Sequence, residues 1–302
     1  MIRVIIGPTA AGKTRIALRL AAARNLAIVG ADSRQVYQGF DIGTAKPTPQ
    51  ERAEVPHYGI DLISPLVRYS AHAWASGAAG WIEQARGIGR TPVVVGGTGF
   101  YIRTLVSPLD AMPGLEPSRR NALGGWLATL DTELLRRWCA RLDPDRASLG
   151  RTQQLRAVET ALLAGRRLSD GFGGGSGPGV HDVRYLVVDP GAVLAERIVL
   201  RVNAMLAAGW LAEVEALDAV VPAAAPAWNA SGYEALRGCV RGALSQRDAV
   251  ARIVIETRQY AKRQRTWCRH QLPDGTVTQL NPDSADAFDR ALAWWDGDLE
   301  TT

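Results

Sequence analysis

A glycine-rich run near the N-terminus has the residue types of a phosphate-binding loop. The run reads GPTAAGKT and fits the pattern G-x-x-x-x-G-K-[ST], with a short apolar run before it and a helical pattern after it. Backbone N–H groups of such a loop point at phosphate oxygens, the Lys13 ammonium adds a point charge, and the Thr14 hydroxyl can reach a magnesium ion. We therefore predict a diphosphate-binding site that comprises Gly7, Pro8, Thr9, Ala10, Ala11, Gly12, Lys13 and Thr14.

The sequence gives only weak evidence for the metal-binding Asp that kinases and hydrolases add to such a loop. These enzymes usually hold magnesium with an Asp at the end of another strand. The run from Tyr185 to Asp189 has that outline, but Pro190 follows at once, so a core strand is the favoured interpretation. Another apolar run, 92–95, is followed by Gly-Gly-Thr at 96–98 and offers no carboxylate. Phosphate binding is predicted, and other uses of a diphosphate stay open.

A carboxylate follows a second short apolar run, 26–29, which ends in Gly-Ala-Asp-Ser. Asp32 is expected at the same sheet edge as the phosphate loop, with its carboxylate facing the pocket. The alternative is that Asp32 is an N-cap whose carboxylate accepts N–H groups of the next turn. The residue types alone leave both roles open.

Short apolar runs alternate with helical patterns and so predict the elements that carry these residues. The apolar runs lie at 3–6, 26–29, 92–95 and 183–188, and three of them end in small or polar residues. This alternation is typical of an α/β protein in which helices cover both faces of a parallel sheet. With the phosphate loop, it predicts a P-loop NTPase-like sheet whose carboxyl edge binds the ligand.

A stretch of different character interrupts this pattern. Residues 110–180 carry two helical runs and close with a glycine-rich segment, 171–179, that predicts a flexible or extended connection. We expect 110–180 to form a small helical insertion domain and 1–109 with 181–302 to form a discontinuous catalytic core. The tail from Pro273 onward has a turn and a short amphipathic segment that ends in two tryptophans.

The composition limits the class of protein. The formal net charge of +5 is compatible with a polyanionic partner but too mild to demonstrate one. Three widely spaced cysteines indicate neither a disulfide framework nor a zinc site. Neither an apolar run of membrane-spanning length nor a basic-then-apolar leader is visible, so we expect a cytoplasmic protein. Of the 35 basic residues only Lys13, Lys46 and Lys262 are lysines, and all three lie inside motifs.

Seven motifs together resemble the tRNA dimethylallyltransferases of bacterial type, and they occur here in the family's order. They are GPTAAGKT at 7–14, DSRQVYQGFDIGTAKP at 32–47, VPHYGID at 55–61, GGTGFY at 96–101, RAVE at 156–159, GYEAL at 232–236 and YAKRQRTW at 260–267. The resemblance implies transfer of the dimethylallyl group from dimethylallyl diphosphate to the exocyclic N6 amine of the adenine 3′ to the anticodon, with release of diphosphate.

The resemblance also implies roles for single residues. Asp32 matches the family's general base, and Thr98 matches a threonine at the reacting adenine and diphosphate. Arg201 and Lys13 match the cations on the diphosphate, and Mg²⁺ with Thr14 as its protein ligand is the implied cofactor. These assignments make Asp32, Thr98, Lys13 and Arg201 the candidate catalytic residues.

The implied partner is the anticodon stem-loop of tRNA, held by the insertion, with a monomeric enzyme as the family expectation. Where family members usually carry basic residues before RAVE, this chain has two glutamines. The candidate tRNA-binding residues are Asp32, Ser33, Arg34, Gln35, Thr98, Gln153, Gln154, Arg156, Lys262 and Arg265. Three alternatives stay open: an isopentenyltransferase acting on free adenine nucleotides, a P-loop small-molecule or nucleotide kinase, and a non-catalytic RNA-binding module.

Overall fold

The computed structural model describes residues 1–107, 116–171 and 182–299, and the statements below concern these residues. The chain divides into two compact units, and each is described by itself. The first comprises Met1–Val106 and Val180–Thr302, and the second is Ser107–Gly179. Residues 110 and 180, at which we expected the insertion to begin and end, lie outside the described residues, as does the glycine-rich connection from residue 172 on.

Within the described residues, the first unit is built on one six-stranded parallel sheet, which confirms the predicted α/β class. The strand order is β3-β2-β4-β1-β5-β6. The strands are β1 Ile2–Ile6, β2 Leu26–Ala31, β3 His57–Tyr58, β4 Thr91–Gly96, β5 Val183–Val188 and β6 Val277–Leu280. Gly96 pairs with both Ile6 and Ala31, so β1, β2 and β4 end level with one another. The loops that leave these three strands therefore start side by side.

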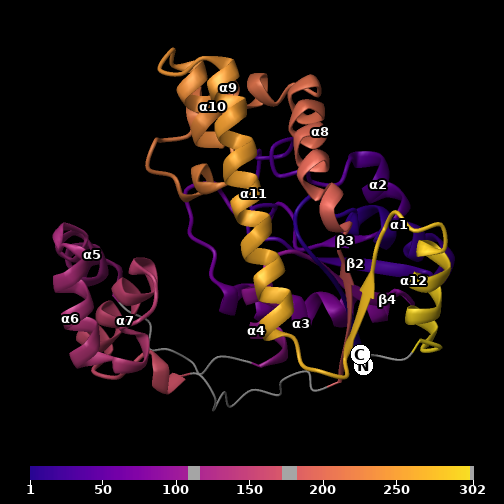
Figure 1. Cartoon of the computed structure of the whole chain (residues 1–302), viewed down its shortest axis with the longest axis horizontal. Coiled ribbons are helices and arrows are strands. Elements are labelled where there is room, and N and C mark those ends of the chain that lie inside the picture. The colour runs from indigo at the N-terminus through magenta and orange to yellow at the C-terminus, as the bar shows by residue number, and fades with distance from the viewer. Residues whose placement is uncertain (108–115, 172–181, 300–302) are drawn as a thin grey trace. The chain divides into compact units, whose positions relative to one another are not determined.

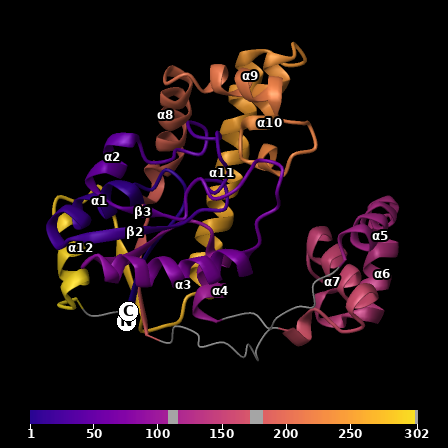
Figure 2. The same ribbon diagram turned by 180° about the vertical axis from the view of Figure 1, so that it is seen from behind.

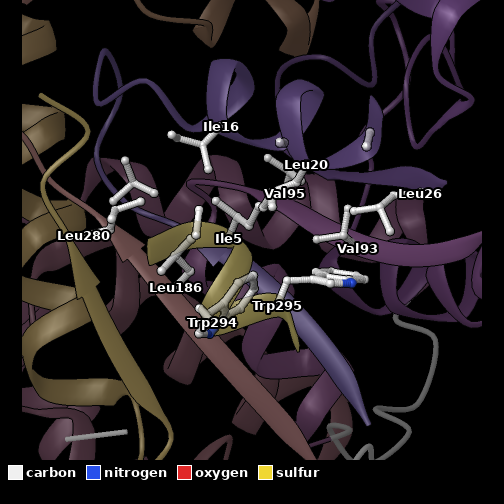
Figure 3. Packing of buried hydrophobic residues seen from close by; sticks show 14 of the residues in the cluster. Ile5, Ile16, Leu20, Leu26, Val93, Val95, Leu186, Leu280, Trp294 and Trp295 are labelled. Carbon is white, nitrogen blue, oxygen red and sulfur yellow. The ribbon is translucent and has the colours of Figure 1, made fainter. Parts of the chain in front are cut away.

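Helices cover both faces of the sheet. The helices of this unit are α1 Lys13–Arg24, α2 Pro49–Glu54, α3 Ala71–Gly87, α4 Gly99–Val106, α8 Leu194–Ala207, α9 Trp210–Val220, α10 Tyr233–Val240, α11 Gln246–Gln271 and α12 Ala287–Asp296. One face packs on α1 and α12 through a cluster that includes Ile5, Leu20 and Trp294 (Figure 3). The other face packs on α3, α4 and α11, with Trp74 and Ile102 in its cluster. Strand residues of alternating parity fill the two clusters, as the pleat requires.

The tail after Pro273 belongs to this core. Its strand β6 pairs in parallel with β5 at the sheet edge. Its helix α12 buries Trp294 at 1% exposure beside Trp295 (Figure 3). The sequence predicted an amphipathic segment here, and the structure adds that its apolar side closes one face of the sheet.

A third apolar cluster joins a helical lobe to the loop that follows β2. Phe40 from that loop packs against Trp228 and Tyr233, with ring centroids 5.2 and 4.8 Å apart. Helix α11 contributes Ile253 to this cluster and Cys268 to the cluster under the sheet. One long helix therefore connects the lobe of α8, α9 and α10 with the sheet (Figure 1 and Figure 2).

The second unit is a small helical domain with its own core. Its helices are α5 Pro117–Thr129, α6 Thr132–Leu142 and α7 Arg151–Ala164. They pack around a cluster that includes Leu127, Leu135 and Val158. In neither unit does a described helix have the length and apolarity needed to cross a membrane.

Candidate functional site

An open cavity lies at the carboxyl edge of the sheet. Its wall is formed by the loop after β1 with the start of α1, by the ends of β2 and β4, and by side chains from α8 and α11. The residues that line it are Thr9, Lys13, Thr14, Ala17, Ile28, Gly30, Asp32, Gln35, Ala45, Pro47, His57, Ile60, Val95, Gly96, Gly97, Arg201, Tyr260 and Gln264. Asp32, Lys13 and Arg201, predicted from separate motifs, share this cavity.

The phosphate-loop sequence leads directly into α1. Gly12 is the N-cap of α1 with a φ of 92°, a left-handed conformation that favours glycine. Because Gly12 has no side chain, the first N–H groups of α1 receive no side-chain cap. Such N–H groups carry the positive end of the helix dipole and suit an anion.

Lys13 lies against this loop. Its Nζ donates to the carbonyl oxygens of Gly7, at 3.0 Å, and Pro8, at 2.7 Å. Burial, with a smaller contribution from the positive charge of Arg201, lowers the pKa of Lys13 to about 8, while Asp32 acts in the opposite direction. An anion bound in the cavity would compensate the charge that burial disfavours.

Arg201 projects from α8 into the same cavity. Burial lowers the pKa of its guanidinium, and the negative charge of Asp32 opposes that shift. Within the described ranges, the guanidinium has no hydrogen-bond or ion-pair partner. A desolvated cation without a partner is costly, so this position is suited to binding an anion.

Asp32 has both of the roles that the residue types left open. It lines the cavity, and its Oδ1 accepts the backbone N–H of Arg34 at 2.8 Å. Its Oδ2 accepts no hydrogen bond from the part of the chain that the structure describes. One carboxylate oxygen is thus anchored while the other is left to act on a ligand.

Hydroxyl groups surround this carboxylate. Thr98 follows the lining residues of β4, and its Oγ1 accepts the N–H of Ser33 at 3.1 Å. The Tyr260 side chain lines the cavity and lies close to Thr98. Burial, with a smaller contribution from the negative charge of Asp32, raises the pKa of Tyr260 to about 12, so its hydroxyl keeps its proton at neutral pH.

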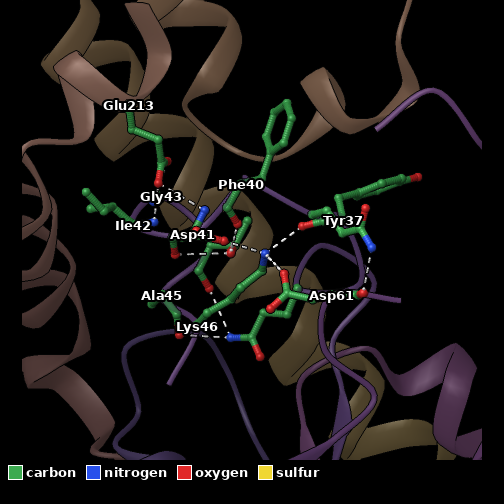
Figure 4. A network of polar contacts seen from close by, with 12 residues as sticks. Tyr37, Phe40, Asp41, Ile42, Gly43, Ala45, Lys46, Asp61 and Glu213 are labelled. Atoms are coloured by element: carbon green, nitrogen blue, oxygen red, sulfur yellow. Dashed lines mark hydrogen bonds and ion pairs between the residues drawn. The ribbon is translucent and has the colours of Figure 1, made fainter. Parts of the chain in front are cut away.

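A polar network fixes the segment after Asp32 as a wall of the cavity (Figure 4). The Nζ of Lys46, 2% exposed in its side chain, donates to the Tyr37 carbonyl at 2.6 Å and to the carboxylates of Asp41, at 2.5 Å, and Asp61. Gln35 donates to two further carbonyls of the segment, at 2.9 and 3.0 Å. Lys46, one of the three lysines, therefore holds the chain together rather than facing the ligand.

Helix α9 braces the same segment from the other side. The Glu213 carboxylate accepts the backbone N–H groups of Asp41, Ile42 and Gly43 at 3.0, 2.6 and 3.4 Å (Figure 4). It also accepts the Tyr233 hydroxyl at 2.6 Å. Tyr233 of the GYEAL motif thus supports the cavity wall indirectly, through its hydrogen bond to Glu213.

Two of the predicted tRNA-binding residues have partners within the protein. Gln154 is 4% exposed and donates to the Ala147 carbonyl at 2.7 Å, so its predicted contact with tRNA is wrong. Arg265 forms a two-pronged ion pair with Asp189, at 2.8 and 2.5 Å. This pair gives Asp189 a structural partner, while the Arg265 side chain stays 33% exposed and its predicted tRNA contact stays a prediction.

The other predicted contacts stay predictions. Gln153 caps α7 by accepting the Gly150 N–H, and Arg156 pairs with Glu159 at 2.5 Å while remaining exposed. Lys262 is exposed on α11. Ser33 and Arg34 do not line the cavity, but their backbone N–H groups donate to the side chains of Thr98 and Asp32.

Sequence reasoning missed Tyr260 and Gln264, although both lie in the YAKRQRTW motif. They are four residues apart on α11, and a pair at that spacing faces the same side of a helix. That spacing could have indicated that Tyr260 and Gln264 share a helix face, apart from the exposed cations that lie between them in the sequence.

Comparisons with known proteins agree with this geometry. A family model described as IPP transferase matches residues 35–271, and one described as isopentenyl transferase matches residues 1–57. A tRNA dimethylallyltransferase of Deinococcus radiodurans is 40% identical over 299 residues, which cover 97% of this chain and 96% of the relative.

Solved structures show the same fold. The tRNA delta(2)-isopentenylpyrophosphate transferase of Staphylococcus epidermidis superposes with a TM-score of 0.68 at 30% identity, over 98% of both chains. A eukaryotic dimethylallyltransferase acting on tRNA superposes with a TM-score of 0.79 at 23% identity, over 99% of this chain and 80% of that one, and so shares the fold.

Proposed function

Because this chain belongs to the IPP transferase family, we propose that it transfers the dimethylallyl group from dimethylallyl diphosphate to the exocyclic N6 amine of an adenine in tRNA, with release of diphosphate. The proposed acceptor is the adenine 3′ to the anticodon. The observation that carries the proposal is a single cavity in which two desolvated cations, Lys13 and Arg201, share the wall with the carboxylate of Asp32.

The diphosphate is proposed to lie between the phosphate loop and Arg201. The uncapped N–H groups at the start of α1 and the two cations supply positive charge at that end of the cavity. When the allylic C–O bond breaks, the leaving diphosphate gains negative charge, and groups already aimed at that position stabilise it without rearranging. The same groups therefore bind the donor and assist its departure.

The five-carbon chain is proposed to lie against the apolar part of the wall. Ala17, Ile28, Pro47, Ile60 and Val95 line the cavity there without a charged group among them. Burying an allyl group against such a surface is favourable, at about 25 cal/mol per Å² of apolar area. Water is also displaced from the carbon that reacts.

Asp32 is proposed as the general base. The amine of adenine is a weak nucleophile, and it must lose a proton as its nitrogen bonds to the allylic carbon. The free Oδ2 of Asp32 is suited to accept that proton, while the Arg34 N–H holds the carboxylate in orientation. The hydroxyls of Thr98 and Tyr260, next to Asp32, are proposed to orient the adenine.

Mg²⁺ is proposed as a cofactor held by Thr14 and the diphosphate oxygens. The Thr14 hydroxyl lines the cavity beside Lys13. Among the described residues, no group of three His, Cys, Asp or Glu side chains could hold a metal. That arrangement fits a cation that keeps several waters and binds mainly through substrate phosphates. When bound, the ion would neutralise charge on the leaving diphosphate.

The tRNA is proposed to be recognised through its anticodon stem-loop by a monomer. The second unit and the exposed cations of α11, such as Lys262, are the proposed contacts. Enzymes that act on a base take it out of the stack into a pocket, and a cavity open at the sheet edge suits a flipped adenine.

The decisive experiment incubates the purified protein with unmodified tRNA and labelled dimethylallyl diphosphate, followed by nuclease digestion to map the label. Label on the adenine 3′ to the anticodon supports the proposal, and its absence there refutes it. A parallel reaction with AMP tests the free-nucleotide alternative, and one with labelled ATP tests phosphoryl transfer. The matched control is Asp32→Asn, which keeps the size of the side chain and removes the base.

A further inference from the structure

One buried side chain of α11 joins the two halves of the cavity. The Oε1 of Gln264 accepts the backbone N–H of Thr9 at 2.8 Å. Its Nε2 donates to the carbonyl of Gly97 at 2.8 Å. Gln264 is 7% exposed, so water does not compete for either bond. Thr9 belongs to the phosphate loop, and Gly97 directly precedes Thr98.

The orientation of this amide follows from its partners. A backbone N–H can only donate and a carbonyl can only accept, so Oε1 must face Thr9 and Nε2 must face Gly97. Glutamate could replace the first contact but would place carboxylate lone pairs against the Gly97 carbonyl. Lysine or arginine could donate to Gly97 but could not accept from Thr9. Of the long side chains, an amide is the one that satisfies both.

The loop after β4 is pressed against α11 at two further points. A Cβ atom at Gly97 would overlap the Gln264 amide, and a Cβ atom at Gly99 would overlap the indole of Trp267. Thr98 lies between these glycines and close to Tyr260 of the same helix. Three side chains of α11 therefore set the position of the loop that carries Thr98.

The sheet already holds these strands without Gln264. Gly96 is paired in register with Ile6 and Ala31, and the Thr98 N–H donates to the Ala31 carbonyl. What Gln264 adds is the link from the phosphate loop to this acceptor-side loop. The two loops approach each other directly at Gly7 and Gly97, and Gln264 adds the bond that fixes the phosphate loop further along, at Thr9.

We propose that Gln264 is a positioning residue that sets the spacing between the phosphate loop at Thr9 and the Thr98–Asp32 side of the cavity, so that the allylic carbon faces the adenine amine. This inference rests on the proposed prenyl transfer. Its loss leaves donor binding to Lys13 and Arg201 in place but misaligns the acceptor. Displacements of about 1 Å at a reacting centre cost about 100-fold in rate.

A specific by-product follows from misalignment. The C–O bond still breaks, and the diphosphate leaves with the bonding electron pair. A water oxygen then bonds to the allylic carbon and loses a proton, which gives dimethylallyl alcohol in place of prenylated tRNA. The ratio of alcohol to prenylated tRNA therefore reports positioning, whereas a variant that is merely less stable lowers both products together.

The test compares Gln264→Leu with the wild type and with Gln259→Leu, an exposed glutamine of the same helix. For Gln264→Leu we expect kcat for tRNA prenylation to fall about 100-fold, KM for both substrates to change little, and the ratio of alcohol to prenylated tRNA to rise about tenfold or more. Gln259→Leu should match the wild type. Gln264→Glu, which keeps the size and the bond from Thr9, should shift the ratio in the same direction and serves if the leucine variant unfolds.

Two outcomes overturn the inference in distinguishable ways. In the first outcome, both Gln264 variants keep the wild-type ratio of alcohol to prenylated tRNA, and kcat is normal or falls only in proportion to the folded fraction. That result would show that Gln264 is purely structural. Failure of the wild-type protein to prenylate tRNA would overturn the proposed function, and this inference with it, whatever the variants do.

Discussion

Raising the pH from about 7 to about 9 should weaken donor binding about tenfold, because binding depends on the charge of Lys13. The pKa of Lys13 is lowered to about 8, chiefly by burial. Its protonated fraction in the free protein therefore falls from about nine-tenths at pH 7 to about one-tenth at pH 9. The affinity that depends on this charge is fully present well below pH 8 and is lost as the pH rises through it.

The assay is calorimetric titration with a non-reactive thio analogue of dimethylallyl diphosphate at constant ionic strength and magnesium concentration. Lys13→Met is the informative variant, since it lacks the titrating group. Its binding should be weaker at pH 7 and nearly independent of pH, so that its curve approaches that of the wild type above about pH 9. Lys262→Met, which removes an exposed lysine, should follow the wild type.

Parallel curves for the wild type and Lys13→Met would refute this reasoning. Any common slope would then come from titration of the ligand or of another group. The charge of Lys13 would contribute nothing to donor binding over this pH range.

Three further predictions concern the base and the packing. Asp32→Asn should lower the single-turnover rate of transfer by about 100-fold or more, since an amide cannot take the proton, while gel-shift assays show tRNA binding retained. Gly43→Ala should destabilise the protein by about 1–3 kcal/mol in denaturant unfolding, because a Cβ atom there would overlap the Trp210 indole. Trp294→Ala should cost about 3–5 kcal/mol in the same assay, because α12 would lose a large side chain that is only 1% exposed.

Each of these predictions has a result that would contradict it, and the two stability predictions have a matched control variant. Near-normal turnover of Asp32→Asn would show that another group takes the proton. Gly80 lies within α3, and a Cβ atom there would meet open space, so Gly80→Ala should stabilise the protein by about 0.5–1 kcal/mol. A Gly43→Ala variant that was stabilised in the same way would contradict the close approach of Gly43 to Trp210. Leu200 is 60% exposed, so Leu200→Ala should change the free energy of unfolding by no more than about 0.5 kcal/mol. An equally small effect of Trp294→Ala would mean that α12 does not close the core.

The phosphate loop could be predicted from the sequence because its geometry is local. Eight consecutive residues, with a strand before and a helix after, specify where the N–H groups point. The same holds for Asp32, whose place follows from the strand that ends just before it. The parallel sheet was also within reach, since buried strands of such a sheet are apolar throughout.

The tail and the insertion contain contacts that local sequence patterns did not predict. A short run ending in two tryptophans predicts an amphipathic segment, but only the folded chain shows that it closes a sheet face beside β6. Gln154 was assigned to the RNA from its place before the RAVE motif, yet its amide is buried and donates to the Ala147 carbonyl. Polarity in a sequence predicts exposure only when no internal partner exists.

By itself, the sequence predicted a phosphate site at the start of a helix and placed a carboxylate at the same sheet edge. The tertiary structure alone decided which of the remaining polar residues act there. Arg265 pairs with Asp189 across 76 residues, whereas Gln264, its neighbour in the same motif, reaches Thr9 across 255 residues and Gly97 across 167. The physical reason is that a polar side chain shielded from water is costly unless it finds a partner. The partners of Gln264 and Arg265 are brought together by the packing of α11 on the sheet edge rather than by any local pattern.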